Sequence, residues 1–196
     1  MGSSSPYTGS LKALRALPTC LWLLSFLSLP DPAGAGQTNE IRSPATIVAT
    51  YFENADISRN VHYLTEDQNT AAYALTGDKK IRNIVYAYTI SMNGDTVGIA
   101  YFDRHAVRSL PQTLMIVVTP KNAIERVEVI TFTEPLEYRP PSRWYATFKN
   151  AVLTPEKTLS PSIHGVTGAT LTHRATTRAA KRALALHRVL RENAAE

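Results

Sequence analysis

Apolar residues recur at every second position from Ile84 onward, and this alternation constrains the fold of the 196-residue chain more than any other feature. It runs over residues 84–90, breaks at Asn93-Gly94-Asp95 and resumes over residues 96–102. A period of two is typical of half-buried β-strands, and Asn-Gly between two such runs is a strong hairpin signal. The apolar segments 113–119 and 124–132 predict two more strands, so we expect four consecutive antiparallel strands.

The end of the chain has a different period. An apolar stripe at helical spacing predicts a long helix over residues 172–193, and its members are Ala175, Ala179, Ala183, Leu186 and Leu190. A shorter helix is expected over residues 67–75, where Thr76-Gly77-Asp78 supplies the stop. Strands in series with helices at both ends predict a single α+β domain, in which the antiparallel sheet has about four strands and the C-terminal helix packs on it.

Three other segments are less regular. The apolar segment 45–52 fits a helix or a strand equally well, and residues 144–148 fit one helical turn. Residues 138–142, with paired prolines, predict a loop. Residues 153–161 contain two prolines and show no clear period.

The first 35 residues have the pattern of a secretory signal peptide. Lys12 and Arg15 precede an apolar run over residues 16–29, and Ala33-Gly34-Ala35 follows it. The run is short for a membrane span, so an uncleaved anchor is the weaker alternative. We therefore expect export, in a bacterium to the periplasm, and a mature domain of residues 36–196.

The composition limits the chemistry of this mature domain. Cys20 is the only cysteine and lies in the signal, which excludes disulfides, thiolate chemistry, cysteine-bound zinc and iron–sulfur clusters from the mature chain. Any redox chemistry must come from a bound group. The net charge of +5 is concentrated in the last helix, where a solvated face is favoured over a nucleic-acid surface because no recognition motif is present.

The segment 162–172 places two glycines and three threonines just ahead of the last helix. Gly165 and Gly168 would let the backbone approach a phosphate or take a positive φ, and the first N–H groups of the helix would point to the same place. Thr167 and Thr172 would add hydroxyl donors. The pattern therefore predicts a phosphate cradle, with one alternative: Thr170 or Thr172 is an N-cap and the glycines form an ordinary turn.

The core of this segment, Thr-Gly-Ala-Thr-Leu-Thr, resembles the attachment motif of the FMN-binding domain family. The resemblance extends over residues 84–190 and includes the Asn93-Gly94-Asp95 hairpin, the Thr133-Glu134-Pro135 step and the turn over residues 144–148. It implies that FMN is the cofactor and that its phosphate is esterified to Thr170. Contacts are then implied for Gly165, Thr167, Gly168, Ala169, Leu171 and Thr172, with Glu134 reaching the ribityl chain or ring and Trp144 flanking the ring.

The resemblance also implies a function and partners. The domain would be an extracytoplasmic electron carrier rather than a free-standing enzyme, because the flavin itself accepts and passes the electrons. A separate FAD-dependent FMN transferase would attach the cofactor and release AMP. A redox protein or a membrane electron-transport complex would exchange electrons with it.

Further side chains are candidates for contact with the ring. The aromatic ones are Tyr101, Tyr138 and Tyr145, which core packing explains equally well. Arg104, His105 and Arg108 could supply a proton or a positive charge, although a solvent-facing loop is the favoured explanation.

Two other functions remain open. His164 occupies the position, six residues before Thr170, where the family pattern has an acidic residue. This favours a non-covalent or flavin-free sensory or assembly module of a membrane redox complex as the alternative. A hydrolase with a threonine or serine nucleophile, with His164 or His173 as its base, is disfavoured because no acidic residue lies between Glu156 and Glu192.

Overall fold

The computed structural model describes residues 42–78 and 81–192, all within one compact unit, Glu40–Glu196. The signal peptide predicted for residues 1–35 lies outside the described residues. The fold class is confirmed as α+β.

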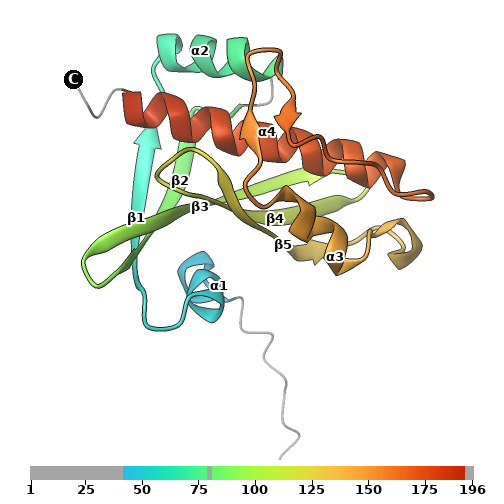
Figure 1. Ribbon diagram of the computed structural model, residues 1–196, viewed down its shortest axis with the longest axis horizontal. Helices are drawn as coiled ribbons and strands as arrows, with labels where there is room; N and C mark the ends of the chain where they lie inside the picture. The colour runs from blue at the N-terminus through green and yellow to red at the C-terminus, as the bar shows by residue number, and fades with distance from the viewer. Residues whose placement is uncertain (1–41, 79–80, 193–196) are drawn as a thin grey trace, which may run out of the picture. The chain divides into compact units, whose positions relative to one another are not determined.

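Five antiparallel strands form the main sheet, in the same order as in the sequence (Figure 1). They are β1 (Asp56–Tyr63), β2 (Ile84–Met92), β3 (Asp95–Ala106), β4 (Pro111–Val118) and β5 (Ile124–Phe132). The four predicted strands are confirmed, and so is the hairpin turn, in which Asn93 and Gly94 have φ of 52° and 88°. The edge strand β1 was not expected, because most of its residues are exposed and its apolar period is weak.

The described residues also form four α-helices: α1 (Pro44–Tyr51), α2 (Glu66–Thr76), α3 (Ser142–Tyr145) and α4 (Thr170–Glu192). The ambiguous segment 45–52 is thus helical, with Pro44 at its start and the Ser43 side chain accepting from the N–H of Thr46. The predicted stop of α2 is confirmed, since Gly77 ends the helix with φ of 70°.

Shorter elements connect β5 to α4. The 3₁₀ turn η1 (Leu136–Tyr138) is followed by α3, and α3 continues into the 3₁₀ turn η2 (Ala146–Phe148), which confirms the helical turn expected there. A small hairpin of β6 (Val152–Leu153) and β7 (Leu159–Ser160) lies in the segment without a clear period.

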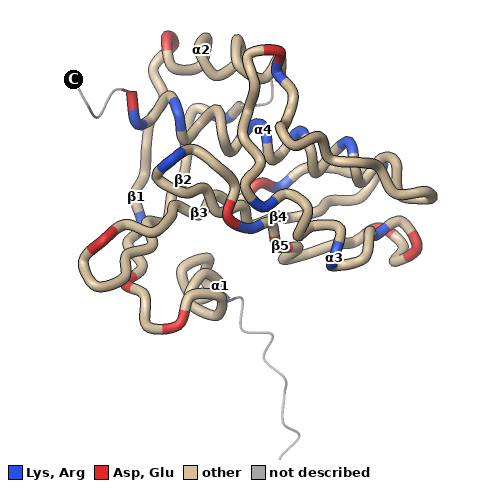
Figure 2. Tube along the Cα trace, in the orientation of Figure 1, with Lys and Arg blue, Asp and Glu red and all other residues tan. Residues whose placement is uncertain are grey.

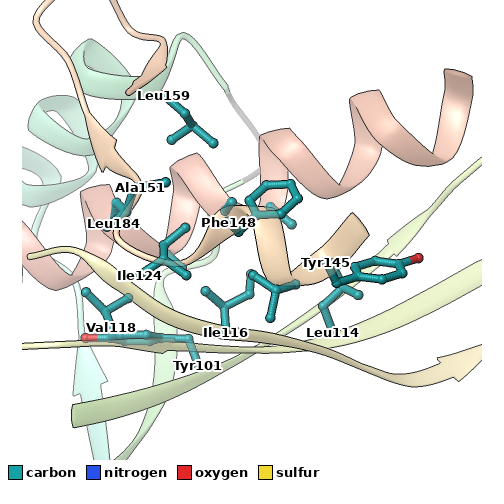
Figure 3. Packing of buried hydrophobic residues seen from close by; sticks show 14 of the residues in the cluster. Tyr101, Leu114, Ile116, Val118, Ile124, Tyr145, Phe148, Ala151, Leu159 and Leu184 are labelled. Carbon is teal, nitrogen blue, oxygen red and sulfur yellow. The ribbon is translucent and has the colours of Figure 1, made fainter. Parts of the chain in front are cut away.

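The larger core lies between one face of the sheet and α4. Alternate residues of β4 point into it and meet Phe148 and Leu184 (Figure 3). The apolar stripe of α4 is largely buried, as the helical period predicts. On the opposite face α1 covers a second cluster, in which Val48 packs against residues of β2, β3 and β4.

Basic residues recur along α4 (Figure 2). Arg174, Arg178 and Arg188 are exposed, which fits the solvated face expected from the sequence. Arg182 is the exception, because its side chain is buried and paired with carboxylates. In the described part of the chain, no helix is both long and apolar enough to span a bilayer.

Candidate functional site

The predicted phosphate cradle forms the turn that leads into α4. Gly168 has φ of +83°, which glycine adopts without the steric cost that other residues carry. The N–H of His173 donates to the carbonyl of Ala169 at 2.9 Å, so Ala169 is the N-cap and Thr170 is the first helical residue. The alternative in which Thr170 or Thr172 caps the helix is therefore wrong.

An alanine at the N-cap has no side-chain oxygen that could accept from the first turn of the helix. Among the described residues, no hydrogen-bond acceptor is found for the N–H groups of Thr170, Leu171 and Thr172. These groups also carry the positive end of the helix dipole. The start of α4 thus has the donors and the partial charge that favour a phosphate.

A hollow of about 170 Å³ lies beside this helix start. Residues from three segments line it: Val107 and Arg108 after β3, Glu134 and Tyr138 after β5, and Gly168, Ala169, Thr170, Leu171 and Thr172 at the motif. The structure thus brings Glu134 to the motif. Gly165, Thr167 and Trp144, also predicted as site residues, lie outside the lining.

Of the two threonines that line the hollow, Thr170 is the one with an available hydroxyl. Its side chain is exposed, and its hydroxyl makes no hydrogen bond within the described residues. Thr172, in contrast, is buried, and its hydroxyl donates to the carbonyl of Tyr138 at 2.6 Å. The sequence predicted that the Thr172 hydroxyl would donate to a phosphate. In the structure it donates to Tyr138 instead and ties the segment after β5 to α4.

Glu134 organises the turn between β3 and β4. It is 6% exposed, and its Oε1 accepts from the N–H groups of Leu110 and Ser109, both at 2.7 Å, and of Arg108 at 3.0 Å. The hydrogen bonds from Leu110 and Ser109 hold the pKa of Glu134 below its usual range. Glu134 is therefore a buried, ionised carboxylate that forms part of the wall of the hollow.

Trp144 lies against the loop that precedes α4. Its Nε1–H donates to the carbonyl of His164 at 2.7 Å, and its ring packs edge-on against His173. Gly165 also lies beside the His173 imidazole: a Cβ added at this position would be 3.6 Å from Nδ1. Gly165 lacks the positive φ that one of its predicted roles required, and it packs against His173 instead. Thr167 is exposed in the turn before Gly168.

The three tyrosine candidates lie in different parts of the structure. Tyr138 lines the hollow. Tyr145 is buried among the core residues, where burial raises the pKa of its phenol to about 12. Tyr101 lies beneath α4 and pairs with His187 through its hydroxyl, 3.2 Å from Nδ1. Tyr138 is therefore the tyrosine placed to flank a bound ring.

Among the basic candidates, Arg108 follows the end of β3 and lines the hollow. His105 lies within β3, where it is hydrogen-bonded to Asp103. Neither His164 nor His173 has a ring hydrogen bond to a hydroxyl in the described residues, and His173 Nε2 lies 3.1 Å from the carbonyl of Ile163. Within the described residues, neither imidazole is therefore hydrogen-bonded to a threonine or serine that it could activate.

Val107 was not expected in the site. It follows a strand of alternating residues and carries no group that indicates binding. Only the path of the chain after β3 places it beside the motif.

We expect Gly168→Ala to destabilise the domain by about 1–2 kcal/mol, because alanine is strained at a positive φ. No atom lies within 4 Å of the added Cβ, so strain is the only cost. Gly165→Ala is the matched control: its Cβ meets His173 at an ordinary contact distance and φ is not in the strained range, so the effect should be within about 0.5 kcal/mol. Urea unfolding compares the two, and equal losses would contradict the role given to Gly168.

An exposed hydroxyl at an uncapped helix start, beside a hollow with a buried carboxylate, is the arrangement of a cofactor-binding α+β domain. Residues 108–185 match the family model of the FMN-binding domain. The match contains the motif and every residue of the hollow except Val107. FMN is the cofactor that it indicates, with flavin binding and electron transfer as the general function. No curated protein and no solved structure gives a significant match to the chain.

Proposed function

We propose that this protein is an extracytoplasmic electron carrier that holds FMN through a phosphoester to Thr170. The observation that carries the proposal is the exposed Thr170 hydroxyl at the first position of an uncapped helix, within the FMN-binding match. When bound, FMN would supply the redox chemistry, and the protein would place it and adjust its potential.

The helix start is suited to the phosphate of such an ester. A phosphodiester retains one negative charge, and the N–H groups of Thr170, Leu171 and Thr172 can donate to its oxygens. Arg108 adds a positive side chain at the hollow. The ionised Glu134 opposes a phosphate, but three backbone donors on one of its oxygens offset that charge.

The hollow suits the phosphate end of FMN better than its ring. Its volume of about 170 Å³ is below the roughly 300 Å³ at which pockets for whole cofactors begin. Leu171 in its lining and Leu136 in η1 are both exposed apolar side chains. Together with Tyr138 they offer the ring an apolar surface.

Attachment requires a second protein. In the proposed step the Thr170 oxygen bonds to the phosphorus on the FMN side of FAD, the pyrophosphate bond breaks, AMP leaves and the hydroxyl proton is released. An FAD-dependent FMN transferase would carry it out, and the exposed position of Thr170 gives such an enzyme access.

The covalent bond agrees with the proposed export. A reversibly bound cofactor is retained only in proportion to its free concentration over its dissociation constant, and free FMN is expected to be scarce outside the cytoplasm. An ester removes this dependence. The electron partner is then another exported redox protein or a membrane electron-transport complex.

A second candidate function follows from one observation. His164, six residues before Thr170, stands where the family pattern has an acidic residue, and recognition by the transferase can depend on that position. In this candidate the domain binds FMN reversibly or not at all and serves a membrane redox complex as a sensory or assembly module.

Thr170→Ala tests the proposal. With an FMN transferase and export in the same cells, we expect the denatured wild-type band to fluoresce under ultraviolet light on a gel and the variant band to lose all fluorescence, because no other oxygen replaces the ester. Thr167→Ala is the matched control, since it removes an exposed hydroxyl of the same loop. Fluorescence retained by Thr170→Ala would contradict the assignment, and a wild-type band without fluorescence would favour the second candidate.

A further inference from the structure

Strands β2 and β3 separate at one end of the pair. They are paired only where Ala87–Met92 face Asp95–Tyr101. Beyond this point residues 84–86 pair with β1 alone, and residues 102–106 pair with β4 alone. In Figure 1 β2 turns toward α2 while β3 continues beneath α4.

The separation opens a cavity of about 390 Å³ between the two strands, α1 and α4. This volume is more than twice that of the hollow at Thr170 and falls within the range of roughly 300–1,000 Å³ typical of ligand pockets.

Three aromatic rings form one wall of this cavity: Tyr86, Tyr88 and Phe102. Tyr88 and Phe102 pack edge to face with 5.5 Å between their centroids. Tyr86 is 47% exposed, and the guanidinium of Arg59 covers one side of its ring at 4.7 Å from the centroid, so a ligand ring would use the other side. A flat aromatic molecule would find stacking partners here.

A histidine nitrogen without a partner lies at the polar side of the cavity. His105 Nδ1 is 2.7 Å from Asp103 Oδ1, and the side chain of His105 is 9% exposed. Its Nε2 is buried and has no hydrogen-bond partner among the described residues. Arg182 donates two hydrogen bonds of 2.8 Å to Asp103 and so holds this carboxylate in place. Because the carboxylate accepts from His105, it fixes the orientation of the imidazole and places a proton on Nδ1. With its proton on Nδ1, the ring would offer Nε2 as an acceptor to a ligand hydroxyl.

The charge of the cavity favours an anion. Arg82 and Arg104 line it, are exposed and form no ion pair within the described ranges. Arg182 also lines it, but its charge is taken up by Asp103 and Asp78.

We propose that this cavity is a second ligand site, separate from the hollow at Thr170, which binds a small aromatic carboxylate that also carries a hydroxyl group. The ring stacks on Tyr86 and Phe102, the hydroxyl donates to His105 Nε2, and the carboxylate pairs with Arg82 or Arg104. No step of this binding uses the flavin.

The test uses the full chain and 6-hydroxy-2-naphthoate as the probe, followed by its fluorescence. We expect saturable binding of one molecule, weakened about tenfold for 2-naphthoate, which lacks the hydroxyl, and for 2-naphthol, which lacks the carboxylate. His105→Phe should bring the affinities of hydroxynaphthoate and naphthoate together. Absence of saturable binding, or an unchanged ratio in the variant, would overturn the proposal.

Tyr86→Ala should weaken the hydroxynaphthoate about tenfold, because it removes the exposed ring of the wall. Tyr63→Ala is the matched control: Tyr63 is 74% exposed, pairs with Ile84 in the neighbouring strand and does not line the cavity, so its loss should have no measurable effect. Equal effects of the two variants would indicate nonspecific binding and overturn the site.

Two further measurements cover the remaining outcomes. If His105→Phe does not fold, the ¹⁵N shift of His105 Nε2 in the wild-type protein should move with hydroxynaphthoate and stay in place with naphthoate, and the opposite result overturns the proposal. Flavin-loaded protein and Thr170→Ala should bind the probe equally. Loss of binding on flavin loading would assign the cavity to the cofactor and overturn a separate site, whereas failure of flavin attachment at Thr170 leaves the probe result valid.

Discussion

Arg182→Met is expected to lower the free energy of unfolding by about 3–5 kcal/mol, the usual loss when one partner of a buried ion pair is removed. Arg182 is 6% exposed, and its guanidinium donates to both oxygens of Asp103 at 2.8 Å and to the carboxylate of Asp78. The variant would leave a buried carboxylate at Asp103 without its guanidinium partner.

The pKa of Asp103 shows how much the folded state depends on this pair. Burial alone would raise it, but the hydrogen bonds from His105 and Arg182 outweigh burial and hold the pKa well below its usual range. The ion pair joins α4 to β3 and to Asp78, two residues after the end of α2. Its loss should therefore loosen the contact between the two helices as well.

Arg188→Met is the matched control on the same helix. Arg188 is exposed and bonds to Glu192 at 2.9 Å, four residues along the helix, and such pairs contribute about 0.5 kcal/mol or less. Urea unfolding at neutral pH measures both variants. Similar losses in Arg182→Met and Arg188→Met would contradict the role of the buried pair.

The second large effect is a loss of stability in mild acid that depends on His187. Its side chain is buried against Tyr101, and burial, with a smaller contribution from the charge of Arg191, lowers its pKa to about 4. An unfolded histidine binds a proton below about pH 6.5, whereas the folded one remains neutral until about pH 4. The unfolded state thus binds more protons in this window, so stability falls as the pH falls through it.

From about pH 7.5 to about pH 5 the contribution of His187 amounts to a loss of about 2 kcal/mol. His187→Gln keeps an acceptor for the Tyr101 hydroxyl but cannot titrate, so its stability should fall by about 2 kcal/mol less than that of the wild type over the same pH range. The same slope in wild type and His187→Gln would contradict a neutral, buried imidazole.

Most of the fold could be predicted from local patterns. The apolar runs between Ile84 and Phe132 and the apolar stripe of α4 have the periods of a strand and of a helix, and both periods are visible in the sequence. Strand β1 could not be predicted in this way. It lies at the edge of the sheet with most of its side chains in solvent, so burial imposes little alternation on its residues.

The residues of the site that are adjacent in the sequence could be predicted. Gly168, Thr170 and Leu171 are neighbours in the chain, so the motif itself brought them together. The approach of Glu134 came from the family resemblance and not from its spacing. Trp144 and Thr172 were assigned to the cofactor, but their hydrogen bonds go to backbone carbonyls of His164 and Tyr138, which no local pattern reveals.

The buried ion pair is the largest feature that sequence analysis missed. Asp103 and Arg182 are 79 positions apart, and Arg182 looks like its exposed neighbours on a basic helix. The sequence shows only that Asp103 is an acidic residue within a strand. The structure adds that its neighbours on the same face, Tyr101 and His105, are both largely buried. Only the packing of α4 on β3 identifies its partner.

The intact mass of the exported protein after denaturation tests the central claim most directly. Expressed with an FMN transferase, the mature chain should appear as residues 36–196 plus FMN less one water. A denatured chain with no added flavin mass, obtained from cells in which the transferase is active on another substrate, would contradict the covalent bond to Thr170.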